Sequence, residues 1–87
     1  MKLSSNFSLS ELTKSQTAER HGISNQPTEE HTENLRLLCE NVLQPVRDQF
    51  GPVMISSGYR SEILSEKIGS SRKSQHCRGQ AADFECH

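Results

Sequence analysis

The apolar positions near the amino terminus predict a short helix. Ser8 precedes Glu11 by three residues, the spacing of a capping box in which each side chain accepts a hydrogen bond from a backbone N–H group of the first turn. Phe7 and Leu12 flank this box at the positions of a hydrophobic staple. We therefore expect a helix over residues 9–14.

A second apolar stripe predicts the main helix, after a polar stretch over residues 15–27 that we interpret as a loop. Thr28 is the expected N-cap of a helix of about 20 residues. Its apolar residues recur mostly at steps of three and four, and they are Leu35, Leu38, Cys39, Val42, Leu43, Val46 and Phe50. Pro45 should kink or split this helix, because proline removes one backbone donor. Gly51 and Pro52 should end it.

The last third of the chain predicts two strands separated by a helix and a loop. Residues 53–57 form a short β-branched run, and residues 81–86 alternate in the manner of a second strand. Between them we expect a helix over residues 62–68 and a loop over residues 70–80. The inward-facing residues of that helix are expected to be Ile63, Leu64 and Ile68. The whole pattern predicts one α+β domain over residues 1–87, with helices packed on a small antiparallel sheet.

Composition places limits on function. The 87 residues are only 31% hydrophobic and include no Trp, so we expect thin stability margins that bound metal, a partner chain or missing sequence would offset. The net charge of −1 argues against nucleic-acid binding. Neither a membrane span nor a signal peptide is visible, which predicts a cytoplasmic location at synthesis.

The three cysteines are odd in number and include no tight pair such as C-x-x-C, so we expect no disulfide framework. Cys39 lies on the apolar face of the main helix and is expected in the core. Cys77 and Cys86 are interpreted as plain thiols, although either could ligate a metal as thiolate.

Charge is unevenly distributed. Residues 59–80 carry five basic side chains, Arg60, Lys67, Arg72, Lys73 and Arg78, against two acidic ones, Glu62 and Glu66. A positive field there would suit an anionic group such as a substrate carboxylate, and a solvated loop is the alternative interpretation.

His76 and Asp83 are the main candidates for chemistry. They lie seven residues apart, the first in the predicted loop and the second on the predicted strand, with Gly79 between them. Gly79 would let the backbone turn so that loop and strand converge on one ion. Imidazole nitrogen and carboxylate oxygen together suit zinc, and a lone solvated His in a polar loop is the alternative.

Arg60 is the second candidate, because it follows the first strand through Gly58 and Tyr59. An Arg held at the end of a strand could stabilise an oxyanion or bind a carboxylate through two hydrogen bonds. A surface Arg beside a helix is the alternative.

These residues resemble a known family. The run Gly58-Tyr59-Arg60-Ser61, followed by Ser74-x-His76-x-x-Gly79-x-Ala81-x-Asp83-Phe84, is similar to the zinc D-Ala-D-Ala carboxypeptidase and endolysin family of metallopeptidases. Looser matches in the first half of the chain, from Phe7 to Arg47, resemble the small phage-associated branch of that family.

The resemblance implies a hedgehog/DD-peptidase-like fold and a peptidoglycan stem peptide as substrate. His76 and Asp83 would be zinc ligands, and Arg60 would assist the polarised carbonyl. Ser74 and Gln75 would line the substrate cleft. The zinc would activate water and polarise a peptide carbonyl.

The family's third ligand and its acidic general base have no counterpart in the printed sequence. His87 or Glu85 could substitute, or a neighbouring molecule could supply a ligand. We therefore expect a domain that lacks its C-terminal strand or strands and is weakly active or inactive. A non-catalytic module that binds peptidoglycan or protein is the alternative. A missing strand would also leave residues 81–86 as an exposed sheet edge through which two copies could pair.

Overall fold

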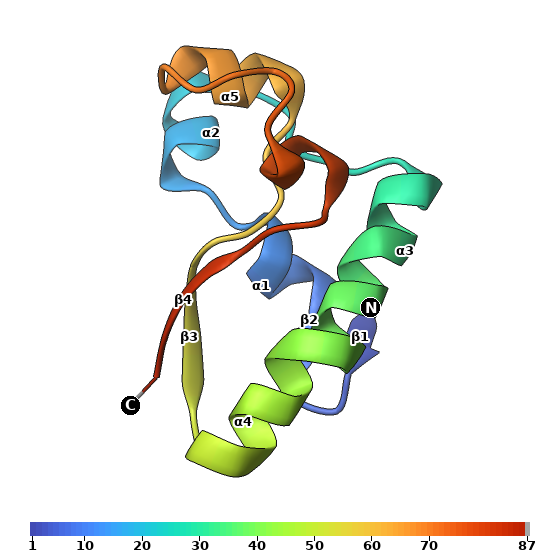
Figure 1. The fold of residues 1–87 in the computed structure, drawn as a ribbon. Helices are drawn as coiled ribbons and strands as arrows, with labels where there is room; N and C mark the ends of the chain where they lie inside the picture. Colours follow the sequence, from blue (N-terminus) through green and yellow to red (C-terminus); the bar gives the residue numbers. More distant parts are fainter. Residues whose placement is uncertain (87) are drawn as a thin grey trace.

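A computed structural model describes residues 1–86 as an α+β fold (Figure 1). The elements in chain order are β1 (Lys2–Ser4), β2 (Phe7–Ser8), α1 (Leu9–Thr13), α2 (Gln16–His21), α3 (Glu29–Leu38), the π-helical turn η1 (Cys39–Leu43), α4 (Gln44–Phe50), β3 (Val53–Ser57), α5 (Glu62–Lys67), the 3-10 turn η2 (Gln75–Arg78) and β4 (Asp83–Cys86). The predicted fold class is therefore confirmed. Within the described residues, every helix is too short or too polar to cross a lipid bilayer.

The amino-terminal elements follow the predicted cap. Ser8 accepts a hydrogen bond from the backbone N–H of Glu11, whose carboxylate in turn accepts one from the Ser8 N–H, which completes the capping box of α1. Phe7 and Leu12 are both buried, as the staple predicts.

The prediction of a loop over residues 15–27 is wrong in its first half, which forms α2. Its cap is local: the Ser15 hydroxyl accepts a hydrogen bond from the Ala18 N–H, and Gly22 ends the helix with φ of 65°. One buried residue, Ala18, anchors it, too little apolar periodicity to stand out in the sequence.

The main helix begins at the predicted cap and is split as Pro45 requires. The Thr28 hydroxyl accepts a hydrogen bond from the His31 N–H at 3.1 Å. The helix runs through α3, η1 and α4, and the π-helical turn lies directly before Pro45, where a regular ladder would lose a donor. The wider turn shifts the apolar stripe, so Val42 and Phe50 are exposed rather than inward-facing.

β3 and β4 form a two-stranded antiparallel sheet in which Met54 lies opposite Glu85 and Ile55 opposite Phe84. The bounds of β3 match the prediction, whereas β4 begins at Asp83, two residues later than expected. In α5, Leu64 is buried as predicted, but Ile63 and Ile68 are exposed. The helix ends at Lys67 and faces the rest of the chain with a narrow stripe of Leu64 and Ser65.

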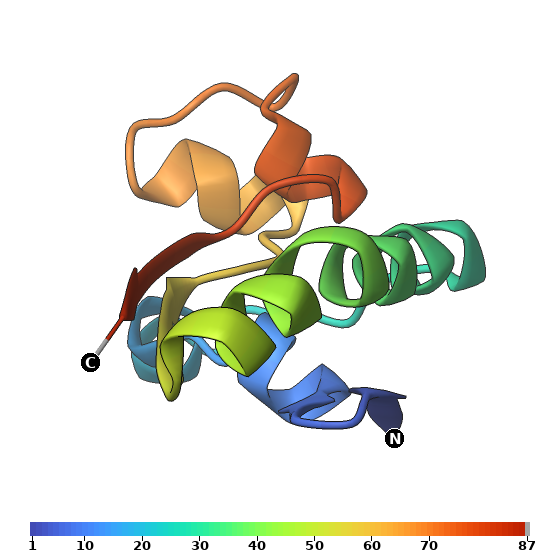
Figure 2. The same ribbon diagram turned by 60° about the horizontal axis from the view of Figure 1, so that its bottom comes forward.

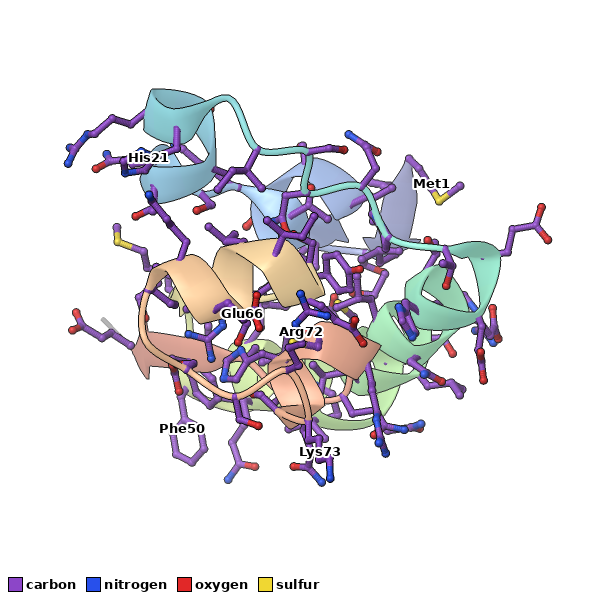
Figure 3. All side chains as sticks on the ribbon, turned by 90° about the horizontal axis from the view of Figure 1, so that it is seen from above. Met1, His21, Phe50, Glu66, Arg72 and Lys73 are labelled. Atoms are coloured by element: carbon purple, nitrogen blue, oxygen red, sulfur yellow. The ribbon has the colours of Figure 1, made fainter. Side chains whose placement is uncertain are left out.

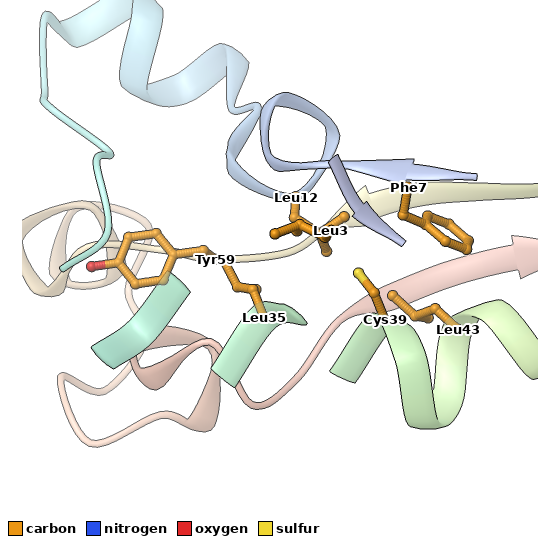
Figure 4. Packing of buried hydrophobic residues seen from close by; sticks show 7 residues of the cluster. All are labelled: Leu3, Phe7, Leu12, Leu35, Cys39, Leu43 and Tyr59. Carbon is orange, nitrogen blue, oxygen red and sulfur yellow. The ribbon is translucent and has the colours of Figure 1, made fainter. Parts of the chain in front are cut away.

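The core lies between the amino-terminal elements and one face of the long helix run (Figure 4). Its buried cluster comprises Leu3, Phe7, Leu12, Leu35, Cys39, Leu43 and Tyr59. In Figure 2, the α3–α4 run crosses the middle of the molecule, with the amino-terminal elements on one side and η2 on the other. One face of the β3–β4 sheet packs against this core through Val53, Ile55 and Phe84. Asp83 therefore lies on the opposite face of the sheet.

Candidate metal centre and adjoining cleft

A short 3-10 turn positions His76. Ser74 caps η2, and its hydroxyl accepts a hydrogen bond from the His76 N–H at 3.2 Å. Gly79 ends the turn in the left-handed region with φ of +74°. This reversal turns the chain toward β4, which begins at Asp83, and such a turn is what the glycine between the two candidates predicts.

The same turn is pressed against α3. A Cβ atom at Gly79 would lie 2.5 Å from the backbone oxygen of His31. Beside it, the side-chain amide of Asn34 donates a hydrogen bond to the Arg78 carbonyl at 2.9 Å. These contacts with α3 therefore hold the η2 turn, and His76 within it, in place.

The His76 imidazole is held by its Nδ1 atom. Nδ1 lies 2.8 Å from the carbonyl oxygen of Gly58, which can only accept, so Nδ1 carries the proton of the neutral ring. Nε2 then has a free lone pair, and it lies 3.7 Å from Oδ2 of Asp83. Only 13% of the His76 side chain is exposed, against 69% for Asp83.

This arrangement fits zinc chemically. A metal-binding His commonly donates its second ring N–H to a carbonyl, which is the role of Gly58 here. Zinc binds nitrogen and carboxylate oxygen at about 2.0–2.2 Å, so two such ligands of one ion lie about 3.4 Å apart at the tetrahedral angle. The observed 3.7 Å is close to that span. Without a cation between them, the His76 ring and the Asp83 carboxylate would attract each other only if the ring carried a second proton.

Two ligands are fewer than the three or more that a zinc site takes from the protein. Within residues 1–86, no group of three or more His, Cys, Asp or Glu side chains gathers closely enough to hold a metal. Glu85 shares the exposed face of β4 with Asp83 but does not complete such a group. Cys77 is a buried free thiol. His87, the other candidate third ligand, lies outside the described residues.

Arg60 is tied to His76 through the backbone, because its N–H donates to the His76 carbonyl at 3.1 Å. Its guanidinium Nε is buried and has no hydrogen-bond partner among the described residues. A buried donor left unpaired costs free energy, so this side chain is poised to gain from an acceptor supplied by a ligand.

Asn25, which is not among the residues predicted from the sequence, clamps the segment around Arg60. Its Nδ2 donates to the carbonyl oxygens of Thr13 at 2.8 Å and Tyr59 at 3.0 Å, and its Oδ1 accepts from the Ser61 N–H at 2.7 Å. Only its position in a loop and its residue type, common in such local clamps, could have suggested this role.

A cleft of about 830 Å³ lies beside the pair. Arg60 and all five residues of β3 line it, together with residues of α1, α2 and α5 and the adjoining turns. His76 and Asp83 do not line it, but Asp83 is paired with Ser57 at its border. Ser74 and Gln75 are not among the lining residues, so substrate contact by these two remains a prediction.

The basic segment is partly neutralised. Arg72 forms ion pairs with Glu66 at 2.6 Å and Glu62 at 3.9 Å, and Figure 3 shows Arg72 beside Glu66 over α5. The hydrogen bonds from Arg72 lower the pKa of Glu66 below its usual range. Arg72 therefore ties the loop to α5 and is not free to attract a substrate.

The model of a family described as Peptidase M15 matches residues 5–87, nearly the whole chain. No curated protein matches the chain. No solved structure matches it either.

Proposed function

Since the chain belongs to the Peptidase M15 family of metallopeptidases, we propose that it is a zinc-dependent peptidase domain acting on peptidoglycan stem peptides. The reaction would be of the D-Ala-D-Ala carboxypeptidase or endolysin type. The observation that carries this proposal is the His76–Asp83 pair: Nε2 and Oδ2 face each other at 3.7 Å, with the ring fixed by Gly58. The resemblance to the phage-associated branch of the family supports the same substrate class.

Each residue then has a defined role. His76 and Asp83 would hold the ion, which when bound supplies Lewis acidity and an activated water. Gly58 keeps His76 in the tautomer that offers Nε2. Arg60, whose Nε is buried without a partner, would donate to the oxygen of the substrate carbonyl as negative charge develops there. Ser74 and Gln75 would contact the substrate from the η2 side.

The described residues offer two candidate ligands, His76 and Asp83, and no third acidic residue grouped with them that could serve as a general base. We therefore propose that this chain by itself binds zinc weakly and hydrolyses little or no substrate. A general base must lie within hydrogen-bond reach of the proton that it abstracts, and zinc alone does not replace it.

The test is digestion of purified peptidoglycan, with released peptides measured by mass spectrometry in the presence of zinc and in EDTA. We expect zinc-dependent release that is weak at most. Robust turnover that disappears in Arg60→Ala would contradict the expected weakness and show that a substitute base completes the site. Release that is unchanged in EDTA would contradict zinc dependence.

The alternative function is a non-catalytic module that binds peptidoglycan or protein through the same fold. The absence of a three-ligand group within residues 1–86 favours it. Sedimentation with insoluble peptidoglycan separates the two: retention that is independent of zinc and of His76 supports the module, whereas retention that requires both supports the metal site.

A further inference from the structure

The cleft follows the unpaired edge of β3. Within residues 1–86, β3 pairs with β4 alone, so one of its two edges is free. All five residues Val53–Ser57 line the cleft, including the inward-facing Ile55 and the outward-facing Met54. Of the β4 residues whose side chains the structure describes, Asp83, Phe84 and Glu85, none does so. A cleft on one face of the sheet would be lined by alternate residues of both strands. This cleft is lined by consecutive residues of β3, so it lies along the free edge of that strand.

A free strand edge presents backbone N–H and C=O groups at the spacing of another strand. Five residues extend over about 16 Å, enough for a peptide of about five residues. On the far side of the cleft, Ser15 and Thr17 offer hydroxyls, and Leu64 and Ile68 give it an apolar end. The mixture of backbone edge, apolar wall and hydroxyls suits an extended peptide.

The charges of the cleft favour an anionic end on that peptide. Lys14 and Arg60 line it against a single acidic residue, Glu11. The Glu11 carboxylate already accepts a hydrogen bond from the Ser8 N–H in the capping box. Arg60 stands just beyond the carboxyl end of β3 and has a buried, unpartnered Nε. A peptide carboxylate at Arg60 would satisfy that donor.

We propose that the free edge of β3 binds the carboxyl-terminal segment of a polypeptide as an added strand, with its terminal carboxylate on Arg60. Because Arg60 lies at the carboxyl end of β3, the bound segment runs parallel to β3. Regular strand pairing requires successive L-residues that alternate between the two faces. Binding there needs neither zinc nor bond cleavage, although it shares Arg60 with the proposed peptidase function.

The test is isothermal titration calorimetry on the full chain in metal-free buffer. The probe is the acetylated L-peptide Thr-Val-Thr-Val-Ala as the free acid, compared with its carboxyl-terminal amide and with a form N-methylated at the central residue. We expect the free acid to bind at least about tenfold more tightly than the amide, since a charge-assisted hydrogen bond is lost. N-methylation should weaken binding as well, because it removes a backbone donor.

The matched variants are Arg60→Gln, which should erase the difference between acid and amide, and Arg78→Gln, an exposed Arg outside the cleft, which should keep it. The comparison of peptides on the unaltered chain holds even if Arg60→Gln fails to fold. Equal affinity of acid and amide, no effect of N-methylation, or no binding by the free acid would overturn the proposal. Equal binding by a peptide of alternating L- and D-residues would also overturn strand addition.

Discussion

At the scale of single residues, the candidate site depends on the close approach of Gly79 to α3. Gly79 has φ of +74°, and a Cβ there would lie 2.5 Å from the backbone oxygen of His31. Gly22 has a similar φ of +65°, but a Cβ there would meet nothing within 4 Å. Alanine substitutions at these two glycines therefore separate the free-energy cost of a left-handed backbone from the cost of a steric clash.

We predict that Gly79→Ala lowers the free energy of unfolding by about 2–4 kcal/mol, from the left-handed backbone and the clash together. Gly22→Ala should cost only about 1–2 kcal/mol, the conformational part alone. Urea denaturation of both variants measures the difference. Equal losses would mean that the η2 turn is not packed against α3 as described.

The buried thiol of Cys39 makes the stability of the fold depend on pH. Burial raises the pKa of its thiol to about 11, and the carboxylates of Glu11 and Glu40 act in the same direction. The unfolded thiol ionises near its ordinary pKa of about 9, so between these values the folded chain holds more protons than the unfolded chain. Stability contributed by this group is thus complete below about pH 9 and is lost as the pH rises toward 11.

We expect alkylation of Cys39 by iodoacetamide at about pH 8, followed by mass spectrometry of its peptide, to be about a hundredfold slower in the folded chain than in urea. The thiolate fraction falls with the raised pKa, and the buried sulfur is also shielded. Similar rates in the two states would contradict the burial of Cys39.

The site residues divide according to how their roles are encoded. His76, Asp83 and Gly79 are close in sequence, so residue type and spacing were enough to predict that loop and strand bring them together. Asn25 and Gly58 act across the fold: the side chain of Asn25 accepts from the backbone N–H of Ser61, and the backbone carbonyl of Gly58 accepts from the His76 ring. Their roles depend on tertiary contacts, which one sequence does not display.

At the scale of elements, local caps were more informative than apolar stripes. The caps at Ser8, Thr28 and Ser61 each start a helix where the sequence predicts one, because a cap needs only its own first turn. The apolar stripes predicted burial wrongly where the helix geometry changes, or where no other element packs against that side of the helix. Val42 lies within the π-helical turn, and Ile63 faces outward from a short helix packed on one side only.

The cap of α3 can be tested directly. We predict that Thr28→Ala lowers the free energy of unfolding by about 1 kcal/mol, because the His31 N–H loses its side-chain acceptor. Thr28→Ser keeps the hydroxyl and should cost much less. Thermal denaturation of the pair measures the effect, and equal losses in the two variants would contradict a role for the hydroxyl.

At the scale of the whole molecule, the chain offers an antiparallel sheet of two strands whose outer edges are both unpaired within residues 1–86. Such edges pair with other chains, and Met54 and Phe50 add exposed apolar surface close to the sheet. Figure 3 shows Phe50 projecting from the rim. We propose that two copies associate weakly through the β4 edge.

This association predicts a scattering mass in solution that rises above 9.8 kDa as the protein concentration increases. The physical reason is mass action on a weak interface of few residues. A monomer mass that does not change over a hundredfold range of concentration would contradict pairing through the edge.

We propose that His76 and Asp83 together hold one zinc ion. Calorimetric titration of the metal-free chain with zinc tests it most directly, with His76→Ala and Asp83→Asn as the altered ligands. His21→Ala is the matched control, since His21 is an exposed residue on α2. We predict about one zinc per chain, bound weakly, lost in both ligand variants and retained in His21→Ala. No zinc binding, or an unchanged titration in His76→Ala, would contradict zinc binding by His76 and Asp83.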